Sequence, residues 1–481
     1  MVTDKQMFLG STASTNASNA PSTDVFNITS GYIMEPMVWN LTAPTSITFD
    51  KIGNMFIAQA GYPFTKIPEV PKILKVNKES GNISIFVEGK LNAPVVDIEY
   101  NNKTDQFFVA HRDKISTIDM NGTINDIIVG LPTNGDHHVN QIDFSTDGEK
   151  ILFGIGSATN SGVVGGEDPV NLEWLKSLPM VHEIPGNNIT LTGQNFVTQN
   201  PLTAEPNDTA TTGAFVPFGT STKEGQIIKG NIKCNGCVLS ANLDGTDLKL
   251  VGWGFRSVYG MSFSSNASSL LLVTVNGADE RGSRPIANDT EKIYTIDISD
   301  SEETGQFYGW PDFFGNSEPV TDPKFQSERS NKSLQFLIQD HPPVRKPFAQ
   351  LEVGAALAQV VFSPQDNNFG FQGMAFIAEF GIMMPISHPD SLEKEIVGQK
   401  IIVFNPQNKS YNDFLSLKIP DSNFRPVGIA FNQHEDALYV SSIGKVEIIT
   451  KLHNGTLLSN PIPCYYQDTG IIWKITKSKI K

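Results

Sequence analysis

Residues 139–157 read VNQIDFSTDGEKILFGIGS, and this stretch sets the pattern of the whole chain. Apolar and polar residues alternate over VNQIDF, a polar turn follows, and a second apolar run closes on small residues. A hydrophobic period of two is typical of a strand with one buried face. The stretch therefore predicts two short strands joined by a turn.

The same phrase occurs six times, and a short echo such as KILKVN, KISTID or KIYTID usually follows it and opens onto a second turn. The copies begin at Ser46, Val95, Val139, Val258, Gln359 and Val427. Units of about four short strands that repeat in this way are typical of a propeller with blades around a central channel. We therefore expect an all-β fold, a six-bladed β-propeller with four-stranded antiparallel blades, whose functional residues lie between the units at one mouth of the channel.

The repeat is interrupted in two places. Residues 158–230 are rich in Gly, Pro, Asn and Thr and form a long loop insertion in the third blade, while residues 315–350 form a second insertion. Such loops are lids, binding loops or disordered segments, although covering exposed blade edges is an alternative for both. We expect residues 1–30 to be a disordered leader and residues 31–481 to form a single propeller domain.

Composition excludes some classes of partner. The formal net charge is −15, and no cluster of Lys and Arg supplies the basic face that a nucleic-acid-binding protein needs. No apolar stretch approaches the ~20 residues that span a membrane. The chain is therefore expected to bind small molecules, with no nucleic acid and no membrane span in this chain.

Cysteines and glycosylation sequons favour an extracellular or cell-surface location. The chain has three cysteines: Cys234 and Cys237 are spaced for a tight disulfide or for two free thiols, and Cys464 is expected to be buried. Asn-x-Ser/Thr sequons occur at Asn16, Asn27, Asn40, Asn82, Asn102, Asn121, Asn188, Asn207, Asn266, Asn288, Asn331, Asn408 and Asn454. Because several fall on turns of the repeat, the chain is expected to be a secreted glycoprotein.

Two candidate catalytic segments directly precede copies of the repeat. GDHHVNQIDF places His137 and His138 before the third copy, where a histidine can act as a general base near neutral pH, or can simply be a surface turn residue. GWGFRSVYGMSF places Arg256 and Ser257 at the equivalent position of the fourth copy. An arginine there can hold an anion or a developing oxyanion, with an ion pair across the loop as the alternative.

Two further segments carry candidate ligand groups. VNGADERGSRPIANDTEKIY closes the fourth copy and gathers carboxylates around Gly277 and Gly282, which suits an oxygen-only ion such as calcium, although a salt-bridged turn has the same composition. FYGWPDFFG holds Tyr308 and Trp310, which could form a flat wall for a planar ligand or a sugar, or could belong to the core.

In these segments the sequence resembles the pyrroloquinoline-quinone (PQQ)-dependent sugar dehydrogenases, the glucose/sorbosone dehydrogenase family of six-bladed propellers. The His-His-x-Asn-x-Ile-x-Phe run, the Arg-x-x-x-Gly-x-x-Phe run, Asn-Gly-Ala-Asp-Glu-Arg-Gly, Tyr-Gly-Trp-Pro and Phe-Arg-Pro-Val-Gly-Ile-Ala appear in family order. The likeness spans about residues 40–480. It implies an oxidoreductase that transfers hydride from a sugar or related alcohol to bound PQQ with the help of calcium, and an external electron acceptor.

The resemblance also implies roles for single residues. His138 matches the general base, and Arg256 matches the arginine beside the reacting quinone oxygen. The calcium site matches Gly277 and Ala278, through their carbonyls, together with Asp279. Ser257 and Arg425 match cofactor-binding positions, and Tyr308 and Trp310 match the rim of the substrate site.

The sequence departs from the family pattern at three positions. Ser257 stands where the family usually has asparagine, AEFGIMM lacks the lysine of the glucose-oxidising members, and Val427 replaces a second late arginine. Since PQQ is a tricarboxylate, each lost cationic partner should weaken binding by ~1.5–3 kcal/mol.

Two other functions compete with the dehydrogenase. A non-catalytic surface propeller could bind glycans or protein partners, because one fold hosts many functions. A calcium-dependent hydrolase such as a lactonase would use a ring of carboxylates and asparagines, for which the inner mouth supplies Asp136, Asn140 and Asn276 but no clear ring. Convergence of His138, Arg256 and Arg425 on one open pocket would favour catalysis, whereas filling of that pocket by residues 158–230 would favour binding.

Overall fold

The structure is a computed structural model of the 481-residue chain. It describes residues 13–15, 20–61, 69–168, 170, 174–203, 205, 207–264, 267–299, 305–330, 332–383, 397–419, 423–432, 436–451 and 457–478.

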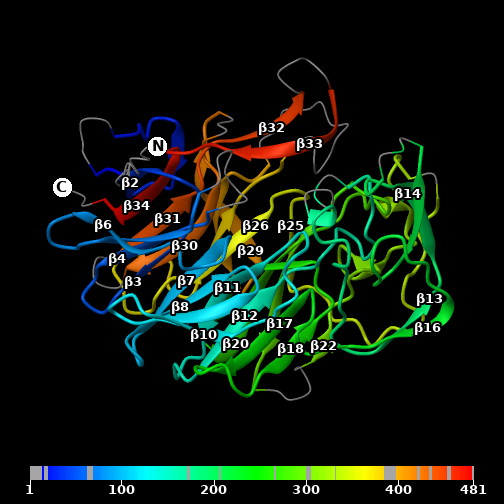
Figure 1. The fold of residues 1–481 in the computed structure, drawn as a ribbon. Coiled ribbons are helices and arrows are strands. Elements are labelled where there is room, and N and C mark those ends of the chain that lie inside the picture. The colour runs from blue at the N-terminus through cyan, green and yellow to red at the C-terminus, as the bar shows by residue number, and fades with distance from the viewer. Residues whose placement is uncertain are drawn as a thin grey trace, which may run out of the picture.

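Six antiparallel sheets, each with a core of four strands, radiate from one axis as the predicted propeller blades (Figure 1). From the axis outward, blade 1 consists of β3 (Pro44–Phe49), β4 (Met55–Gln59), β5 (Lys72–Val76) and β6 (Ile83–Glu88). Blade 2 consists of β7 (Val95–Asn101), β8 (Gln106–His111), β9 (Lys114–Ile118) and β10 (Ile124–Ile128). Blade 3 consists of β11 (Val139–Phe144), β12 (Lys150–Ile155), β17 (Cys237–Asn242) and β18 (Lys249–Trp253).

Blades 4 to 6 follow in chain order. Blade 4 consists of β19 (Ser257–Ser264), β20 (Ala267–Asn276), β21 (Glu291–Asp297) and β25 (Ala349–Leu351). Blade 5 consists of β26 (Leu357–Phe362), β27 (Ala375–Glu379), β28 (Lys400–Asn405) and β29 (Ser410–Leu417). Blade 6 consists of β30 (Pro426–Asn432), β31 (Ala437–Ser442), β34 (Gly470–Lys477) and β2 (Tyr32–Leu41). The six-bladed all-β prediction is confirmed.

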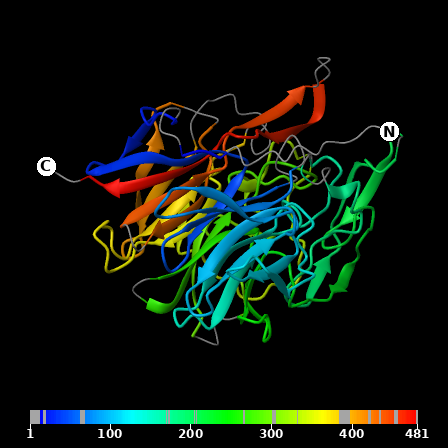
Figure 2. The same cartoon turned by 60° about the vertical axis from the view of Figure 1, so that its left-hand side comes forward.

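The two ends of the chain close the ring together. The inner strands contact one another in the circular order β3, β7, β11, β19, β26, β30 and back to β3. In blade 6, β2 from the start of the chain pairs with β34 from its end, which Figures 1 and 2 show as adjacent blue and red arrows. The two ends of the chain therefore meet in the same blade. Within the stretch expected to be a leader, β1 (Phe26–Ile28) pairs with β29.

The sequence pattern explains how the strands are buried. β11 and β12 pair across the predicted turn, with Phe144 opposite Ile151. All residues of β4 are buried because it lies inside its blade, whereas in the outer strand β6 only Val87 is buried and the other residues are exposed or partly buried. Side chains of neighbouring blades share apolar clusters, as Phe56 of blade 1 and Phe107 of blade 2 do. The core is therefore divided into layers between the blades.

The segment inserted in blade 3 has structure of its own. β12 and β17 are neighbours in the sheet, yet residues 156–236 separate them in the chain. The described part of this segment contains a short helical turn at Trp174 and Leu175 and two strand pairs. The strands are β13 (Ile189–Thr192), β14 (Asn195–Gln199), β15 (Thr209–Gly213) and β16 (Glu224–Ile228). They extend the molecule on the right-hand side of Figure 1.

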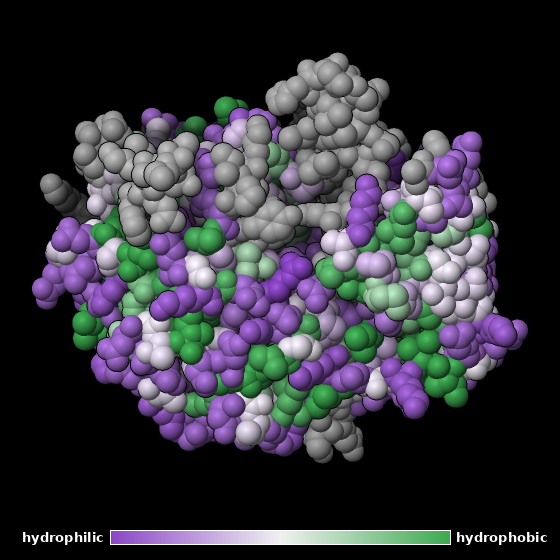
Figure 3. All heavy atoms as spheres, in the orientation of Figure 1, coloured by the Kyte–Doolittle hydropathy of each residue, from purple (hydrophilic) through white to green (hydrophobic). Residues whose placement is uncertain are grey.

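Several smaller elements come between β21 and β25 in the chain. They are β22 (Gln306–Phe307), which pairs with β18, β23 (Phe313–Phe314), β24 (Glu318–Pro319) and the 3-10 helix η2 (Pro323–Phe325). The hairpin β32 (Val446–Lys451) and β33 (Leu457–Tyr465) projects from blade 6 at the top of Figure 1. A search of the described residues finds no helix long and apolar enough to cross a membrane. The face in Figure 3 is mainly hydrophilic, with hydrophobic residues scattered over it.

Candidate functional site

A cavity of about 380 Å³ opens at one mouth of the central channel. Every inner strand contributes a lining residue near its beginning: Thr45, Val96, Asn140, Ser257, Leu357 and Val427. Its size falls in the range of small-molecule sites, roughly 300–1,000 Å³. The loops that precede the inner strands therefore converge, as the repeat predicted.

Most of the predicted site residues of blades 3 and 4 meet at this cavity. His138, Arg256, Ser257, Gly277 and Asp279 all line it. Ala278 lies next to this wall and is buried.

Three predicted residues lie elsewhere. Tyr308 is stacked on Phe255 in the core, with ring centroids 4.1 Å apart, and Trp310 is buried and donates its indole N–H to the Asn160 carbonyl at 3.2 Å. Arg425 donates to the carbonyls of Phe380 and Ile382 at 3.1 and 2.9 Å. None of the three is among the residues that line the cavity.

The two adjacent histidines are both neutral at neutral pH. Burial, with the charge of Arg112 as a smaller contribution, lowers the pKa of His138 to about 4. Burial and the neighbouring Arg256 and Arg281 lower the pKa of His137 well below its ordinary value. The Nδ1 atom of His138 lies 3.3 Å from the Thr133 carbonyl, to which only an N–H can donate. The neutral ring therefore carries its proton on Nδ1 and keeps Nε2 as the acceptor nitrogen.

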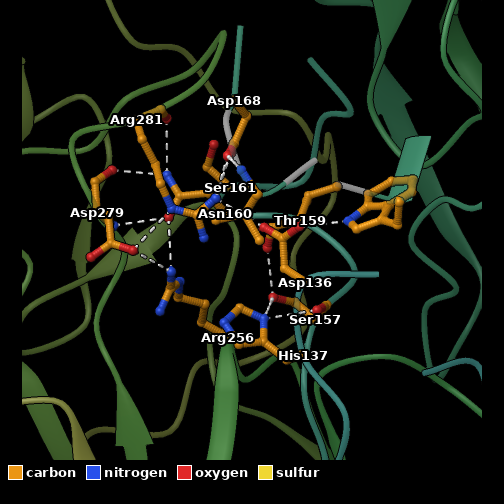
Figure 4. A network of polar contacts seen from close by, with 12 residues as sticks. Asp136, His137, Ser157, Thr159, Asn160, Ser161, Asp168, Arg256, Asp279 and Arg281 are labelled. Atoms are coloured by element: carbon orange, nitrogen blue, oxygen red, sulfur yellow. Dashed lines mark hydrogen bonds and ion pairs between the residues drawn. The ribbon is translucent and has the colours of Figure 1, made fainter. Parts of the chain in front are cut away.

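Arg256 belongs to a buried network of charges that joins blade 4 to the insertion (Figure 4). Its Nη2 donates to Asp279 at 2.7 Å and to the Asn160 side-chain oxygen at 3.1 Å. Arg281 bonds the same Asp279 oxygen at 3.1 Å through Nε, and its Nη1 contacts Asp136 at 3.0 Å and Asp168 at 2.6 Å. The guanidinium groups are thereby fixed in direction.

Burial and mutual charge set the acidities in this network. Burial alone would raise the pKa of Asp279, but Arg256 and Arg281 hold it below its ordinary value. Burial raises the pKa of Asp136 to about 7, and the charge of Asp168 acts in the same direction while Arg281 opposes both. Asp279 is therefore ionised at neutral pH.

The backbone of the Gly277 turn is held by carboxylates on one side. The Gly277 N–H donates to Glu291 at 2.9 Å, and the Ala278 N–H donates to Asp289 at 2.7 Å. Because the N–H and C=O of a trans peptide point in opposite directions, the Gly277 carbonyl faces away from Asp289. A Cβ on Gly277 would lie 2.5 Å from the Asp289 carbonyl oxygen, so this turn requires glycine.

Three buried polar atoms on the cavity wall have no hydrogen-bond partner: Arg256 Nε, Ser257 Oγ and Asn276 Oδ1. Buried polar groups in native proteins are nearly always paired, and each unpaired one costs about 1–3 kcal/mol. A polar ligand bound in the cavity would pair with these three atoms. Within the described residues, no three His, Cys, Asp or Glu side chains gather as a metal site, so an ion here would need backbone or amide oxygens beside a carboxylate such as that of Asp279.

The opposite wall of the cavity is apolar. Tyr259, Phe380, Met383 and Tyr465 line it and pack against a cluster that contains Val427. The guanidinium of Arg425 lies 5.2 Å from the centre of the Phe380 ring. Arg425 therefore supports this wall from behind.

Sequence reasoning missed two groups of lining residues. Arg112 lines the cavity from the turn between β8 and β9, where nothing in the sequence distinguishes it from other turn residues. Val170, Trp174, Ser177 and Leu178 of the insertion also line it. The Trp174 indole donates to Asp136 at 2.8 Å and ties the insertion to the site. The insertion thus forms a wall of the cavity and leaves it open.

None of the three cysteines lines the cavity, although Pro463 and Tyr465, the neighbours of Cys464, do. Cys234 and Cys237 form a disulfide with a Cα–Cα distance of 6.1 Å, and Cys464 is buried and unpaired, as expected.

Comparison with known proteins identifies the fold. No family model matches the sequence, and no curated protein matches it. Solved structures do match. The holo form of the PQQ domain of pyranose dehydrogenase from Coprinopsis cinerea has a TM-score of 0.57 and 14% identity, covering 95% of this chain and 98% of that one.

Two further structures agree. A calcium structure of a Trichoderma reesei enzyme of carbohydrate-active family AA12 has a TM-score of 0.55 and 16% identity, with coverages of 94% and 97%. The apo form of the soluble aldose sugar dehydrogenase of Escherichia coli has a TM-score of 0.51 and 10% identity, with coverages of 93% and 100%. The chain therefore has the six-bladed propeller fold found in structures of PQQ-dependent sugar dehydrogenases.

Proposed function

We propose that the protein is an oxidoreductase that oxidises a sugar or related alcohol by hydride transfer to bound PQQ, assisted by calcium. One observation carries the proposal: His138 and Arg256 line the same cavity, beside three buried polar atoms that lack partners. The names of the similar structures, a pyranose dehydrogenase PQQ domain and an aldose sugar dehydrogenase, support sugar as the substrate class.

The cavity offers groups that suit a planar, polyanionic cofactor. Arg256 and Arg112 supply positive charge, and Ser257 and Asn276 supply unpaired polar atoms. The carbonyls of Gly277 and Ala278, with Asp279, provide hard oxygen ligands of the kind that calcium prefers. The aromatic wall offers a flat apolar surface for a ring system. When bound, the quinone would accept the hydride and calcium would polarise it.

His138 is the proposed general base. Its neutral ring holds the Nδ1 proton against the Thr133 carbonyl, so Nε2 would accept the proton of the substrate hydroxyl as hydride leaves the carbon that bears this hydroxyl. Arg256 stabilises negative charge beside the reacting oxygen, because Asp279 and Asn160 already fix its orientation. Arg425 contributes to cofactor binding by supporting Phe380. Tyr308 and Trp310 contribute to the substrate site by packing the loops behind the cavity.

The test is reconstitution with calcium and PQQ. The purified protein, loaded with both, should reduce an artificial dye in the presence of aldoses, and this turnover requires an external electron acceptor. His138→Gln should retain quinone binding while losing turnover, and His182→Gln, an exchange outside the cavity lining, should retain both. A flat response across a panel of sugars, together with no quinone absorbance after gel filtration, would refute the proposal.

An extracellular or cell-surface location is part of the proposal. Every sequon asparagine within the described residues is exposed, namely Asn27, Asn40, Asn82, Asn102, Asn121, Asn188, Asn207, Asn288 and Asn408. The remaining four, Asn16, Asn266, Asn331 and Asn454, lie outside the described residues. The disulfide fits an oxidising compartment. Mass spectrometry of glycopeptides from the native source tests this, and unmodified asparagine at every sequon would contradict it.

A further inference from the structure

A short buried turn connects the insertion to β17. It consists of residues 234–237, Cys-Asn-Gly-Cys, and we name it the cystine turn after its disulfide. Both cysteines are fully buried, and Asn235 is 5% exposed. Neither Asn235 nor Gly236 lines the cavity. The proposed chemistry therefore does not use them directly.

The Asn235 side chain bonds the backbone on both sides of His138. Its Nδ2 donates to the carbonyls of Pro132 at 2.5 Å and Gly156 at 3.4 Å. Pro132 precedes Thr133, whose carbonyl lies against the His138 ring. The Gly156 N–H donates to the His138 carbonyl at 3.1 Å. Asn235 therefore bonds Pro132, the neighbour of the residue whose carbonyl contacts the His138 ring. It also bonds Gly156, the residue whose N–H donates to the His138 backbone.

Gly236 makes a similar contact with the loop between β18 and β19 that carries Arg256. The Phe255 N–H donates to the Gly236 carbonyl at 3.0 Å. A Cβ on Gly236 would lie 2.0 Å from the Phe255 carbonyl oxygen, and the φ angle of Gly236 is +57°. Both the close approach and the left-handed backbone require glycine at this position.

The cystine turn also holds the insertion. Asn235 accepts from the Ile184 N–H at 3.0 Å through Oδ1 and donates its own N–H to the Ile184 carbonyl at 2.9 Å. The preceding residue, Glu183, accepts from the backbone and the hydroxyl of Thr159 at 2.6 and 2.7 Å. The same four residues therefore contact three segments that build the cavity.

We propose that the cystine turn is the positioning element of the reaction centre, with Asn235 positioning His138, Gly236 positioning Arg256, and the disulfide keeping the two contacts at a fixed spacing. Their roles in catalysis rest on the proposed function, whereas their positioning is a property of the folded chain. The positions of His138 and Arg256 can therefore be tested by NMR and hydrogen exchange, without enzymatic turnover.

The first experiment measures the His138 pKa by NMR. Histidine-labelled protein is titrated, and the His138 signal is assigned through His138→Gln. In wild type the pKa should be about 4, because burial and Arg112 lower it. Asn235→Ala should loosen the segment, admit water to the ring and raise the pKa towards ~6.5. The control is Asn242→Ala, at the other end of β17, which removes an amide bonded to Thr246.

An unchanged His138 pKa in Asn235→Ala would overturn the proposal for this residue. If Asn235→Ala does not fold, Asn235→Ser gives the same readout, because a short hydroxyl cannot reach both carbonyls. Wild type supplies a test without any variant. The amides of Asn235 and Phe255, which donate within this network, should be among the slowest to exchange, and free exchange of either would overturn the proposal.

The second experiment measures hydrogen exchange around Arg256. Gly236→Ala should accelerate exchange in peptides that cover Phe255 and Arg256 about tenfold or more, since the new Cβ displaces the Phe255 carbonyl. Gly245→Ala is a matched control, because its Cβ would lie 2.1 Å from the Ile127 carbonyl oxygen at a φ of +82°, in the turn at the far end of the same strand. Equal acceleration by both substitutions would overturn the proposal for Gly236.

Catalytic assays then distinguish the proposed enzymatic function from the positioning role of the cystine turn. If the loaded wild type turns over, Asn235→Ala should lower kcat more than it changes KM, because it displaces the base and leaves the cavity wall intact. If the wild type shows no turnover, the proposed function fails, while the NMR and exchange results still decide whether the cystine turn positions these residues.

Discussion

Replacing Asp312 by alanine should destabilise the protein more than replacing Asp168. The reason is that the arginine partner of Asp168 bonds two other carboxylates, whereas Asp312 is the carboxylate bonded to Arg284. Asp312 is fully buried and accepts from Arg284 at 2.9 Å, from two backbone amides at 2.8 Å and from His341 at 3.0 Å. Its replacement by alanine leaves the fully buried Arg284 guanidinium with the carbonyls of Ser161, Pro311 and Gln335 in place of a carboxylate. Breaking such a pair should destabilise the protein by about 3–5 kcal/mol.

Asp168 also forms a buried ion pair with an arginine, but its partner Arg281 bonds two other aspartates as well. It bonds Arg281 at 2.6 Å, yet Arg281 keeps Asp136 at 3.0 Å and Asp279 at 3.1 Å when Asp168 is removed. Asp168→Ala should therefore cost only the value of charged hydrogen bonds, ~1.5–3 kcal/mol. Relief of the repulsion between Asp168 and Asp136 reduces that cost further.

The assay is denaturant unfolding at neutral pH, followed by tryptophan fluorescence, for Asp168→Ala and Asp312→Ala. Glu149→Ala, which removes an exposed ion pair with Lys103, is the control and should change stability by less than about 1 kcal/mol. Comparison is valid where each variant unfolds in a single transition with an unchanged denaturant dependence. A loss for Asp168→Ala equal to or larger than that for Asp312→Ala would refute the idea that shared carboxylates buffer the charge of Arg281.

Three further predictions concern the site. His138→Gln should lower kcat by ~10²–10⁴-fold in dye reduction. Because the neutral ring is the active form and burial lowers its pKa to about 4, protonation of His138 in wild type should reduce turnover only as the pH falls to about 4. A loss of turnover that follows His138 protonation near pH ~6.5 would contradict this. Arg256→Met should weaken PQQ binding, measured by calorimetry in calcium buffer, by about tenfold or more, since it removes the buried charge that carries an unpaired Nε; an unchanged Kd would exclude Arg256 from the binding site. Trp174→Phe keeps an aromatic side chain but removes the 2.8 Å bond to Asp136, so it should cost about 1 kcal/mol of stability and raise KM more than it lowers kcat; an unchanged KM would separate the insertion from substrate binding.

The fold could be predicted from sequence because its cause is local. Each blade depends on a period of two between polar turns, and the stretch at 139–157 forms the hairpin β11–β12 that its pattern predicted. Six repeats of that pattern leave few ways to bury every strand other than a closed ring. The extra strand β1 was not predicted, because three residues are too few to show a period.

The candidate site was predicted only in part. His138 and Arg256 precede inner strands at equivalent positions of the repeat, and Gly277 follows the strand that pairs with β19, so their convergence follows from the ring. Tyr308, Trp310 and Arg425 lie near the same loops, but the directions of their side chains depend on packing against Phe255, Asn160 and Phe380, which are distant in sequence. A sequence motif gives the position of a residue in the chain, but it does not show whether the side chain points into the cavity or into the core.

The sequence by itself determined a ring of six blades and the mouth at which its functional loops converge, because hydrophobic period and repeat number are properties of neighbouring residues. Only the tertiary structure decided that Arg281 gathers Asp136, Asp168 and Asp279, that the insertion forms a wall of the cavity, and that Asn235 supports His138. These contacts join residues up to 145 positions apart. Their geometry depends on how far each blade is rotated about the axis and packed against the next, which no local pattern encodes.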